Sequence, residues 1–196
     1  KFTNKITDKD CQRVLKNDVA YSLDNLIGLK DLKENIDKLA NMALYIRKLR
    51  DSGCTMMADF YMHMLLTGNP GTGKTTVANS LARVLYSIGI LKNNKVTVLE
   101  RKDFIGNVIG GSELKTEQVL GPAYGGLIVI DEAYSLNKEG NDYGRIVIDM
   151  LVKAMEEHRE DTVFIFAGYP DEMDEFLSAN PGLSSRFGFR YKFEDY

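Results

Sequence analysis

A glycine-rich loop between an apolar run and a helical pattern constrains the fold of this chain more than any other segment. Residues 68–76 read G-N-P-G-T-G-K-T-T and fit the pattern G-x-x-x-x-G-K-[ST]. The preceding residues 61–66 (Y-M-H-M-L-L) predict a buried strand, and residues 77–85 continue with a helical pattern. Glycines let consecutive backbone N–H groups face one anion, and the N-terminus of the following helix adds partial positive charge. The segment therefore predicts a strand, a phosphate-binding loop and a helix, in that order.

The loop predicts a nucleoside triphosphate as ligand, with ATP as the expected cofactor and Mg²⁺ beside it. Lys74 is expected to reach the β- and γ-phosphates, and the hydroxyl of Thr75 to ligate Mg²⁺. The alternative is an ordinary glycine-rich turn, which the flanking strand and helix disfavour. The expected nucleotide contacts in this segment are Asn69, Pro70, Gly71, Thr72, Gly73, Lys74, Thr75 and Thr76.

Two adjacent carboxylates follow a second short apolar run. Residues 127–130 (L-I-V-I) predict a strand buried on both faces, and Asp131 and Glu132 come directly after it. Carboxylates at the end of a buried strand cost free energy unless a ligand or a reaction uses them. We expect Asp131 to hold Mg²⁺, directly or through water, and Glu132 to act as general base on the attacking water. The alternative is a solvated acidic turn, but together with the loop the pair favours nucleotide hydrolysis, not binding alone.

The composition fits a single domain with a hydrophobic core. The chain has 196 residues, 44% of them hydrophobic, and its net charge of −3 argues against a nucleic-acid surface. No apolar run approaches the roughly 20 residues of a membrane span, and no signal-peptide pattern opens the chain. Cys11 and Cys54 are too few and too isolated for a disulfide framework or a zinc site. These features predict a cytoplasmic protein, and because no Met begins the chain, we interpret it as a piece of a longer one.

Strands alternate with helices along the chain, which predicts an α/β fold. We expect a three-layer αβα sandwich, in which a parallel sheet is covered by helices on both faces and joined by right-handed crossovers. Hydrophobic spacing predicts further helices over residues 31–50, 112–120 and 145–159, a loop over 140–144, and strands over 95–100, 162–167 and 188–193.

Three segments together resemble the CbxX/CfxQ group of AAA+ ATPases, which includes the red-type Rubisco activases and the stage V sporulation protein K. They are the glycine-rich loop, residues 127–136 (L-I-V-I-D-E-A-Y-S-L) and residues 166–186 (F-A-G-Y-P-D-E-M-D-E-F-L-S-A-N-P-G-L-S-S-R). The D-E-A-Y-S-L and A-G-Y-P-D-E-M runs are specific to this group. The resemblance extends over residues 23–196, which we expect to form the large nucleotide-binding AAA+ subdomain of a P-loop NTPase, with residues 1–22 as an N-terminal extension.

The resemblance implies further site residues and partners. Ile27 and Gly28 correspond to residues that contact adenine, and Tyr169 lies near the sensor-1 position. Arg186 corresponds to the arginine finger, an always-charged group that a neighbouring subunit supplies to the γ-phosphate. The alternatives are a surface arginine at that position or the same role for Arg190. The group forms hexameric rings that use ATP hydrolysis to remodel partner proteins, so we expect a protein client, self-association into a ring, and no nucleic acid or membrane as partner.

The chain departs from the group's pattern in two respects. The helical lid that follows residues 193–196 in the group is absent from this chain, so we expect weak nucleotide affinity, poor hydrolysis and poor ring formation. The aromatic position of the central-pore loop falls on Val108, which grips a peptide less than a ring does. Phe104 is the nearest aromatic residue and is expected to pack beneath the loop. This favours mild remodelling or a regulatory switch over polypeptide threading.

Two other classes of function share these motifs, and two histidines admit a catalytic interpretation. A nucleic-acid motor or loader has the same loop and acid pair, as does a nucleotide-gated scaffold that binds without hydrolysis. The acidic balance disfavours the first and the intact acid pair disfavours the second. We interpret His63, inside its apolar strand, as a packed histidine with bonded nitrogens, and His158 as a solvated group near a helix end.

Overall fold

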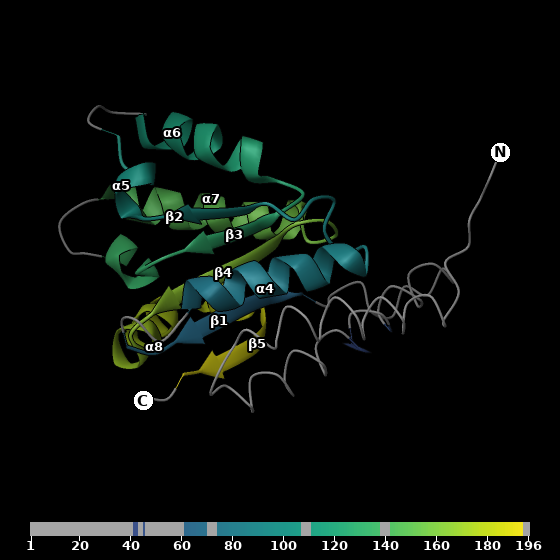
Figure 1. Cartoon of the computed structure of the whole chain (residues 1–196). Helices are drawn as coiled ribbons and strands as arrows, with labels where there is room; N and C mark the ends of the chain where they lie inside the picture. Colours follow the sequence, from purple (N-terminus) through teal and green to yellow (C-terminus); the bar gives the residue numbers. More distant parts are fainter. Residues whose placement is uncertain are drawn as a thin grey trace.

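Five strands form one all-parallel sheet within the part of the chain that the structure describes. This computed structural model describes residues 41–42, 45, 61–69, 74–106, 111–137 and 142–193. The strands lie in the order β2-β3-β4-β1-β5, and each neighbouring pair is parallel (Figure 1). Their bounds are β1 His63–Thr67, β2 Val96–Leu99, β3 Leu127–Ile130, β4 Val163–Gly168 and β5 Phe187–Lys192.

Helices cover both faces of this sheet. On one face lies α4, and on the other lie α7 and α8, with α6 packed against α7 (Figure 1). The helical elements are α4 Lys74–Ser87, α5 Arg101–Phe104, α6 Gly111–Leu120, η3 Gly121–Ala123, η4 Ala133–Asn137, α7 Asp142–Glu157, α8 Pro170–Ala179 and α9 Pro181–Ser184. The predicted three-layer α/β sandwich is confirmed.

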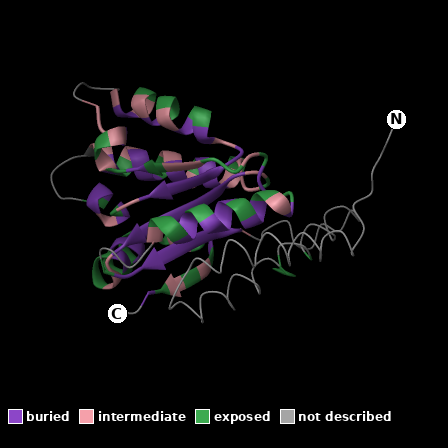
Figure 2. Cartoon of the chain, viewed as in Figure 1, coloured by how far each residue is buried: buried purple, intermediate pink, exposed green. Residues whose placement is uncertain are grey.

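Alternation along the central strands divides the core into two halves. In β1, Met64 and Leu66 face the half that contains α4, whereas Leu65 faces the half that contains α7. In β3, Val129 and Ile130 divide in the same way. Because strand side chains alternate between the two faces, strands covered on both faces are apolar throughout. Figure 2 accordingly shows the central strands buried along their length, whereas α4 is buried only on the side that faces the sheet.

Within the described residues, the predicted strands and helices agree with the structure, but the predicted loop and several unpredicted helical elements differ. The predicted loop over 140–144 is wrong at its end, because α7 already begins at Asp142. Gly144 belongs to the first turn of α7, where it lies so close to the Leu136 carbonyl that a Cβ would overlap it. The hydrophobic spacing also did not predict α8 or the short elements α5, η3, η4 and α9. The helix α8 begins at Pro170, with Tyr169 between it and the end of β4, and proline favours this first helical position.

Several predictions fall on residues outside the described ranges. These are the extension 1–22, the bulk of the helix predicted over 31–50, both cysteines, Ile27, Gly28 and Val108. Phe104, expected to pack beneath the loop, is buried in the core. Among the described residues, no helix has both the length and the apolar content needed to cross a bilayer.

Candidate active site

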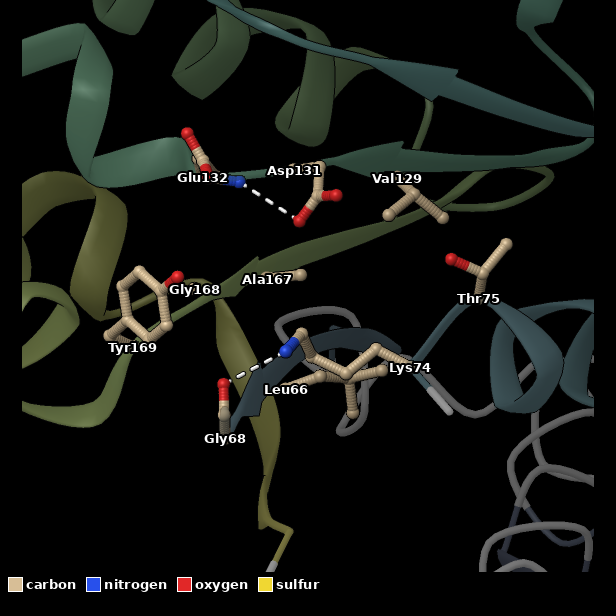
Figure 3. A pocket seen from close by; sticks show the side chains of 10 residues that line it. All are labelled: Leu66, Gly68, Lys74, Thr75, Val129, Asp131, Glu132, Ala167, Gly168 and Tyr169. Carbon is tan, nitrogen blue, oxygen red and sulfur yellow. Dashed lines mark hydrogen bonds between the residues drawn. The ribbon is translucent and has the colours of Figure 1, made fainter. Parts of the chain in front are cut away.

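A cavity of about 310 Å³ opens where β1, β3 and β4 end. Parallel α/β sheets place their ligand sites at this edge, because the loops that follow the strands diverge there. Figure 3 shows the lining side chains converging from three strands and from the start of α4. The lining residues are Leu66, Gly68, Lys74, Thr75, Val129, Asp131, Glu132, Ala167, Gly168 and Tyr169.

Lys74 brings a positive charge into the cavity from the first residue of α4. Its Nζ donates to the carbonyl oxygens of Gly68 and Asn69, both at 2.8 Å. Burial lowers the pKa of the Lys74 ammonium, and the charge of Asp131 partly opposes that shift. Thr75 follows it in the first turn of α4, whose N-terminal amides add partial positive charge. The cation therefore faces the strand that carries the acids across one shared space (Figure 3).

Asp131 and Glu132 enter the cavity from the end of β3. The backbone N–H of Asp131 donates to the Leu99 carbonyl at 2.8 Å, which continues the pairing with β2 by one residue. Oδ1 of Asp131 accepts from the Glu132 backbone N–H at 3.0 Å. Glu132 has φ 47°, in the left-handed region that residues with a Cβ rarely adopt. Such backbone strain is found at functional sites because the surrounding structure enforces a particular side-chain direction.

A second hollow of about 350 Å³ also includes both acids among its lining residues. Arg101, at the start of α5, also lines it and donates from Nη1 to the carbonyls of Ser135 and Leu136 at 2.6 and 3.3 Å. This guanidinium satisfies carbonyls of the turn η4 that directly follows the acids. The acid pair thus shares this hollow with residues of α5 and η4.

Tyr169 lines one side of the cavity, and Tyr134 packs beside it. Tyr169 directly follows β4, and its ring centroid lies 5.8 Å from that of Tyr134 in η4. Burial, together with the charge of Glu132, raises the pKa of Tyr134 to about 12, so its hydroxyl stays protonated at neutral pH. A Cβ on Gly168 would lie 2.9 Å from the Tyr134 ring and 2.7 Å from the Met173 side chain. A larger residue at position 168 would therefore force one of these side chains to shift.

Arg186 lies at the opposite end of the sheet. It directly precedes β5, whose first residue Phe187 pairs with His63 at the start of β1. The five residues of β1 separate this position from the loop, which is roughly 15 Å along a strand. Arg186 is not among the residues lining the cavity of its own chain. Arg190 projects from β5 and donates to Ser184 Oγ at 3.0 Å, also away from the cavity.

Neither histidine belongs to the cavity. His63 is fully buried, accepts at Nδ1 from the backbone N–H of Phe164 at 3.2 Å, and contacts the Met155 carbonyl with Nε2 at 2.9 Å. The interpretation of His63 as a packed, bonded histidine is therefore confirmed. His158 follows α7 and stacks on Tyr124, with ring centroids 3.6 Å apart. The His158 ring is therefore partly covered and not fully solvated as predicted.

The structure thus brings together Lys74, Thr75, Asp131, Glu132 and Tyr169, out of the residues proposed from sequence. Asn69 and Thr76 are exposed beside the cavity and do not line it. Ile27, Gly28, Pro70, Gly71, Thr72 and Gly73 lie outside the described residues. Tyr134 and Gly168 were not predicted as site residues, although both lie in the two group-specific runs. The available signal was that Tyr134 follows the acids in η4 and that Gly168 ends β4.

The parallel sheet, the glycine-rich loop after β1 and the acids after β3 define a P-loop nucleoside triphosphatase fold. Residues 64–195 match the model of the ATPase family associated with various cellular activities (AAA). The chain belongs to this AAA family.

Relatives named after the CbxX/CfxQ group also match the chain, which confirms that resemblance. The chloroplastic ribulose bisphosphate carboxylase/oxygenase activase of Cyanidioschyzon merolae is 44% identical over 173 residues, 87% of this chain and 59% of the relative. The chromosomal CbxX protein of Cupriavidus necator is 43% identical over 173 residues, 87% of this chain and 54% of the relative. The chain thus spans less than two thirds of either relative.

Two solved structures share the fold at low sequence identity. A HORMA:CdnC:Trip13 complex of E. coli MS115-1 contains a chain with a TM-score of 0.62 and 15% identity, covering 91% of this chain and 66% of that one. A RuvB mutant of Thermotoga maritima gives a TM-score of 0.53 and 24% identity, covering 89% of this chain and 48% of that one. Both support the α/β architecture alone.

Proposed function

We propose that this chain is the ATP-hydrolysing core of a machine that remodels a partner protein. The observation that carries the proposal is the convergence of Lys74, Asp131 and Glu132 on one cavity at the carboxyl ends of the parallel strands. A cation that binds phosphates and two acids that serve a metal and a water are the groups that hydrolysis of a triphosphate needs.

Each residue has a distinct role in the proposed reaction. Lys74 binds the β- and γ-phosphates, and Tyr169 contacts the nucleotide from the end of β4. Thr75 and Asp131 fit Mg²⁺, which takes hydroxyl and carboxylate oxygens and supplies neutralising charge when bound. Glu132 accepts a proton from the attacking water as its oxygen bonds to the γ-phosphorus and the bond to the leaving ADP oxygen breaks.

Arg186 acts on the site of a neighbouring subunit in this proposal. Its place at the amino-terminal end of β5 supports this role, because the cavity of its own chain lies at the other end of the sheet. A guanidinium supplied in trans would make hydrolysis depend on assembly into a ring, which we propose to be hexameric. Arginine fingers contribute about 10³–10⁵ in turnover rate.

A protein client is the proposed partner. The relatives at 42–44% identity include proteins named as activases of ribulose bisphosphate carboxylase/oxygenase, which is itself a protein. The chain's net charge of −3 supports a protein client over a nucleic acid, whose phosphates a basic surface would bind.

The decisive experiment measures ATP binding and ATP turnover of Glu132→Gln. This variant keeps the size of the side chain and loses the base, so we expect unchanged nucleotide binding and a loss of turnover by about 10²–10⁴. Glu175→Gln is the matched control, because this exposed glutamate on α8 is remote from the cavity lining.

Lys74→Ala completes the set, and we expect it to lose nucleotide affinity. Turnover by Glu132→Gln equal to that of Glu175→Gln would remove Glu132 from the mechanism. Stimulation of turnover by DNA or RNA, with none by protein, would favour a nucleic-acid motor instead.

A further inference from the structure

The guanidinium of Arg186 is folded back against its own chain. Nη1 donates to the carbonyl oxygen of Gly182 in α9 at 2.6 Å, and Nη2 lies 3.5 Å from Oε2 of Glu156. The guanidinium carbon lies 5.9 Å from the ring centroid of Tyr61, within the range of a cation–π contact. Only 21% of the side chain is exposed. Arg186 must therefore leave these partners before it can bind a phosphate on another molecule.

Glu156 is itself fixed on two sides near the C-terminus of α7. Oε2 accepts a hydrogen bond from the hydroxyl of Tyr61, and Oε1 accepts from Nη1 of Arg159 at 2.6 Å. The Tyr61 hydrogen bond, aided by the charges of Arg159 and Arg186, holds the pKa of the Glu156 carboxyl below its usual value. The carboxylate therefore stays ionised and keeps one orientation toward Arg186.

Among the described residues, the folded-back state leaves Nε of Arg186 without an acceptor. This nitrogen is buried and has no hydrogen-bond partner there, which costs free energy because a buried donor has lost its water. Two guanidinium groups, Arg159 and Arg186, also share the single carboxylate of Glu156. His63 adds no charge, because burial lowers its pKa to about 4. Counting only residues that the structure describes, the cluster thus has a surplus positive charge and a spare donor, both of which an incoming phosphate would satisfy.

We propose that Glu156 is the positioning residue of Arg186 and holds its guanidinium withdrawn until a neighbouring copy of this chain presents a bound nucleotide. The inference rests on the proposed action of Arg186 in trans. Release exchanges one partly exposed ion pair and one carbonyl contact for phosphate oxygens, which also accept from Nε. Assembly then carries a modest penalty, because only the fraction of subunits with a released arginine is competent.

The first test measures the withdrawn state itself in the 196-residue chain. Hydrogen exchange at Nε of Arg186 is followed by NMR, and the signal is assigned by its loss in Arg186→Lys. Glu156→Gln keeps the shape of the partner and removes its charge. Since partly exposed ion pairs shift such equilibria by about twofold to fivefold, we expect exchange to accelerate by that factor.

Glu157→Gln is the matched control on the same helix. Glu157 pairs with Lys153 at 3.7 Å and is the next residue along α7. Tyr61→Phe keeps the ring beneath Arg186 and removes the hydrogen bond that orients Glu156, so we expect a smaller acceleration than in Glu156→Gln. Equal exchange rates in the unmodified chain, Glu156→Gln and Glu157→Gln would overturn the proposal.

The second test measures the effect of Glu156 on Arg186 through ATP turnover at the cavity of a neighbouring chain. Donor chains carry Lys74→Ala and contribute only their Arg186, whereas acceptor chains carry Arg186→Ala and contribute only their cavity. Adding Glu156→Gln to the donor should lower the donor concentration for half-maximal turnover about twofold to fivefold, with the maximum unchanged.

The outcomes separate this inference from the proposed function. A lower maximal turnover with the Glu156→Gln donor would mean that Glu156 supports Arg186 in the bound state, which overturns the withdrawn role. If the unmodified chain turns over ATP but the Lys74→Ala donor restores no turnover to the Arg186→Ala acceptor, the proposed action of Arg186 in trans fails. The exchange measurement on the single chain would then still decide whether Glu156 holds Arg186 back.

Discussion

The buried His63 should make the free energy of unfolding sensitive to mild acid. Its Nδ1 accepts from the Phe164 backbone N–H, so the ring proton is on Nε2, which donates to the Met155 carbonyl. If Nδ1 also carried a proton, its N–H would face the N–H of Phe164, and the buried ring leaves no water to accept from it. Burial is accordingly the largest cause that lowers the pKa of His63 from 6.5 to about 4.

The sign and size of the effect follow from the two pKa values. The unfolded chain binds a proton at this histidine near pH 6.5, whereas the folded chain binds it only near pH 4. The stabilisation is therefore fully present above pH 6.5 and is lost as the pH falls toward 4. At about 1.36 kcal/mol per pKa unit, the whole shift is worth about 3.4 kcal/mol, of which about 2 kcal/mol is lost by pH 5.

Urea unfolding at pH 7.5 and at pH 5.0 measures this loss directly. The chain has two histidines, so His158→Gln is the natural control and should keep the acid sensitivity. His63→Gln should be less stable at pH 7.5, but its stability should change by about 2 kcal/mol less between the two pH values. If His63→Gln loses as much stability as the unmodified chain, the burial argument is refuted. Should that variant fail to fold, an imidazole of His63 that gains its proton above pH 5.5 by NMR would refute it equally.

Two further predictions concern backbone positions. Gly144→Ala should destabilise the fold by about 1–3 kcal/mol in urea unfolding, because its Cβ would overlap the Leu136 carbonyl. Gly182→Ala, where a Cβ meets nothing within 4 Å, should change stability by less than about 0.5 kcal/mol, and an equal loss in both would contradict the packing explanation. Glu132→Asn should be more stable than Glu132→Gln by about 0.5–1 kcal/mol, because asparagine tolerates the left-handed backbone at φ 47° and both variants lose the same charge. Equal thermal stability of those two variants would show that the backbone there is unstrained.

The sheet and the cavity could be predicted because their signals are local in sequence. The strand 127–130 is apolar throughout, since each of its faces is covered, and this pattern identifies a central parallel strand. The glycine-rich loop and the acids each directly follow such a strand. Because all carboxyl ends of a parallel sheet meet at one edge, Lys74 and Asp131 had to converge once the strands were parallel.

What could not be predicted depends on contacts between distant segments. Arg186 and Glu156, which form an ion pair, are 30 positions apart in the sequence. Tyr61, whose hydroxyl donates to Glu156, precedes Glu156 by 95 positions. No spacing rule relates these three residues. The left-handed backbone of Glu132 was equally hidden, because its residue type gives no sign of a positive φ.

The polarity of the sheet also limits how copies of this chain could complete one another's sites. The cavity lies at the carboxyl ends of the strands, whereas Arg186 precedes β5 at their amino-terminal ends. In a two-fold symmetric dimer, Arg186 of each copy would contact the cavity of the other through one shared interface. That interface would have to include both Arg186 and the cavity, and therefore both ends of the sheet. Because these features lie at opposite ends of β1, a head-to-tail contact between two different surfaces satisfies each pair more simply. Head-to-tail contacts close into rings when the rotation between neighbours permits. Under the proposed action of Arg186 in trans, its separation from its own cavity thus favours a ring over the two-fold dimer.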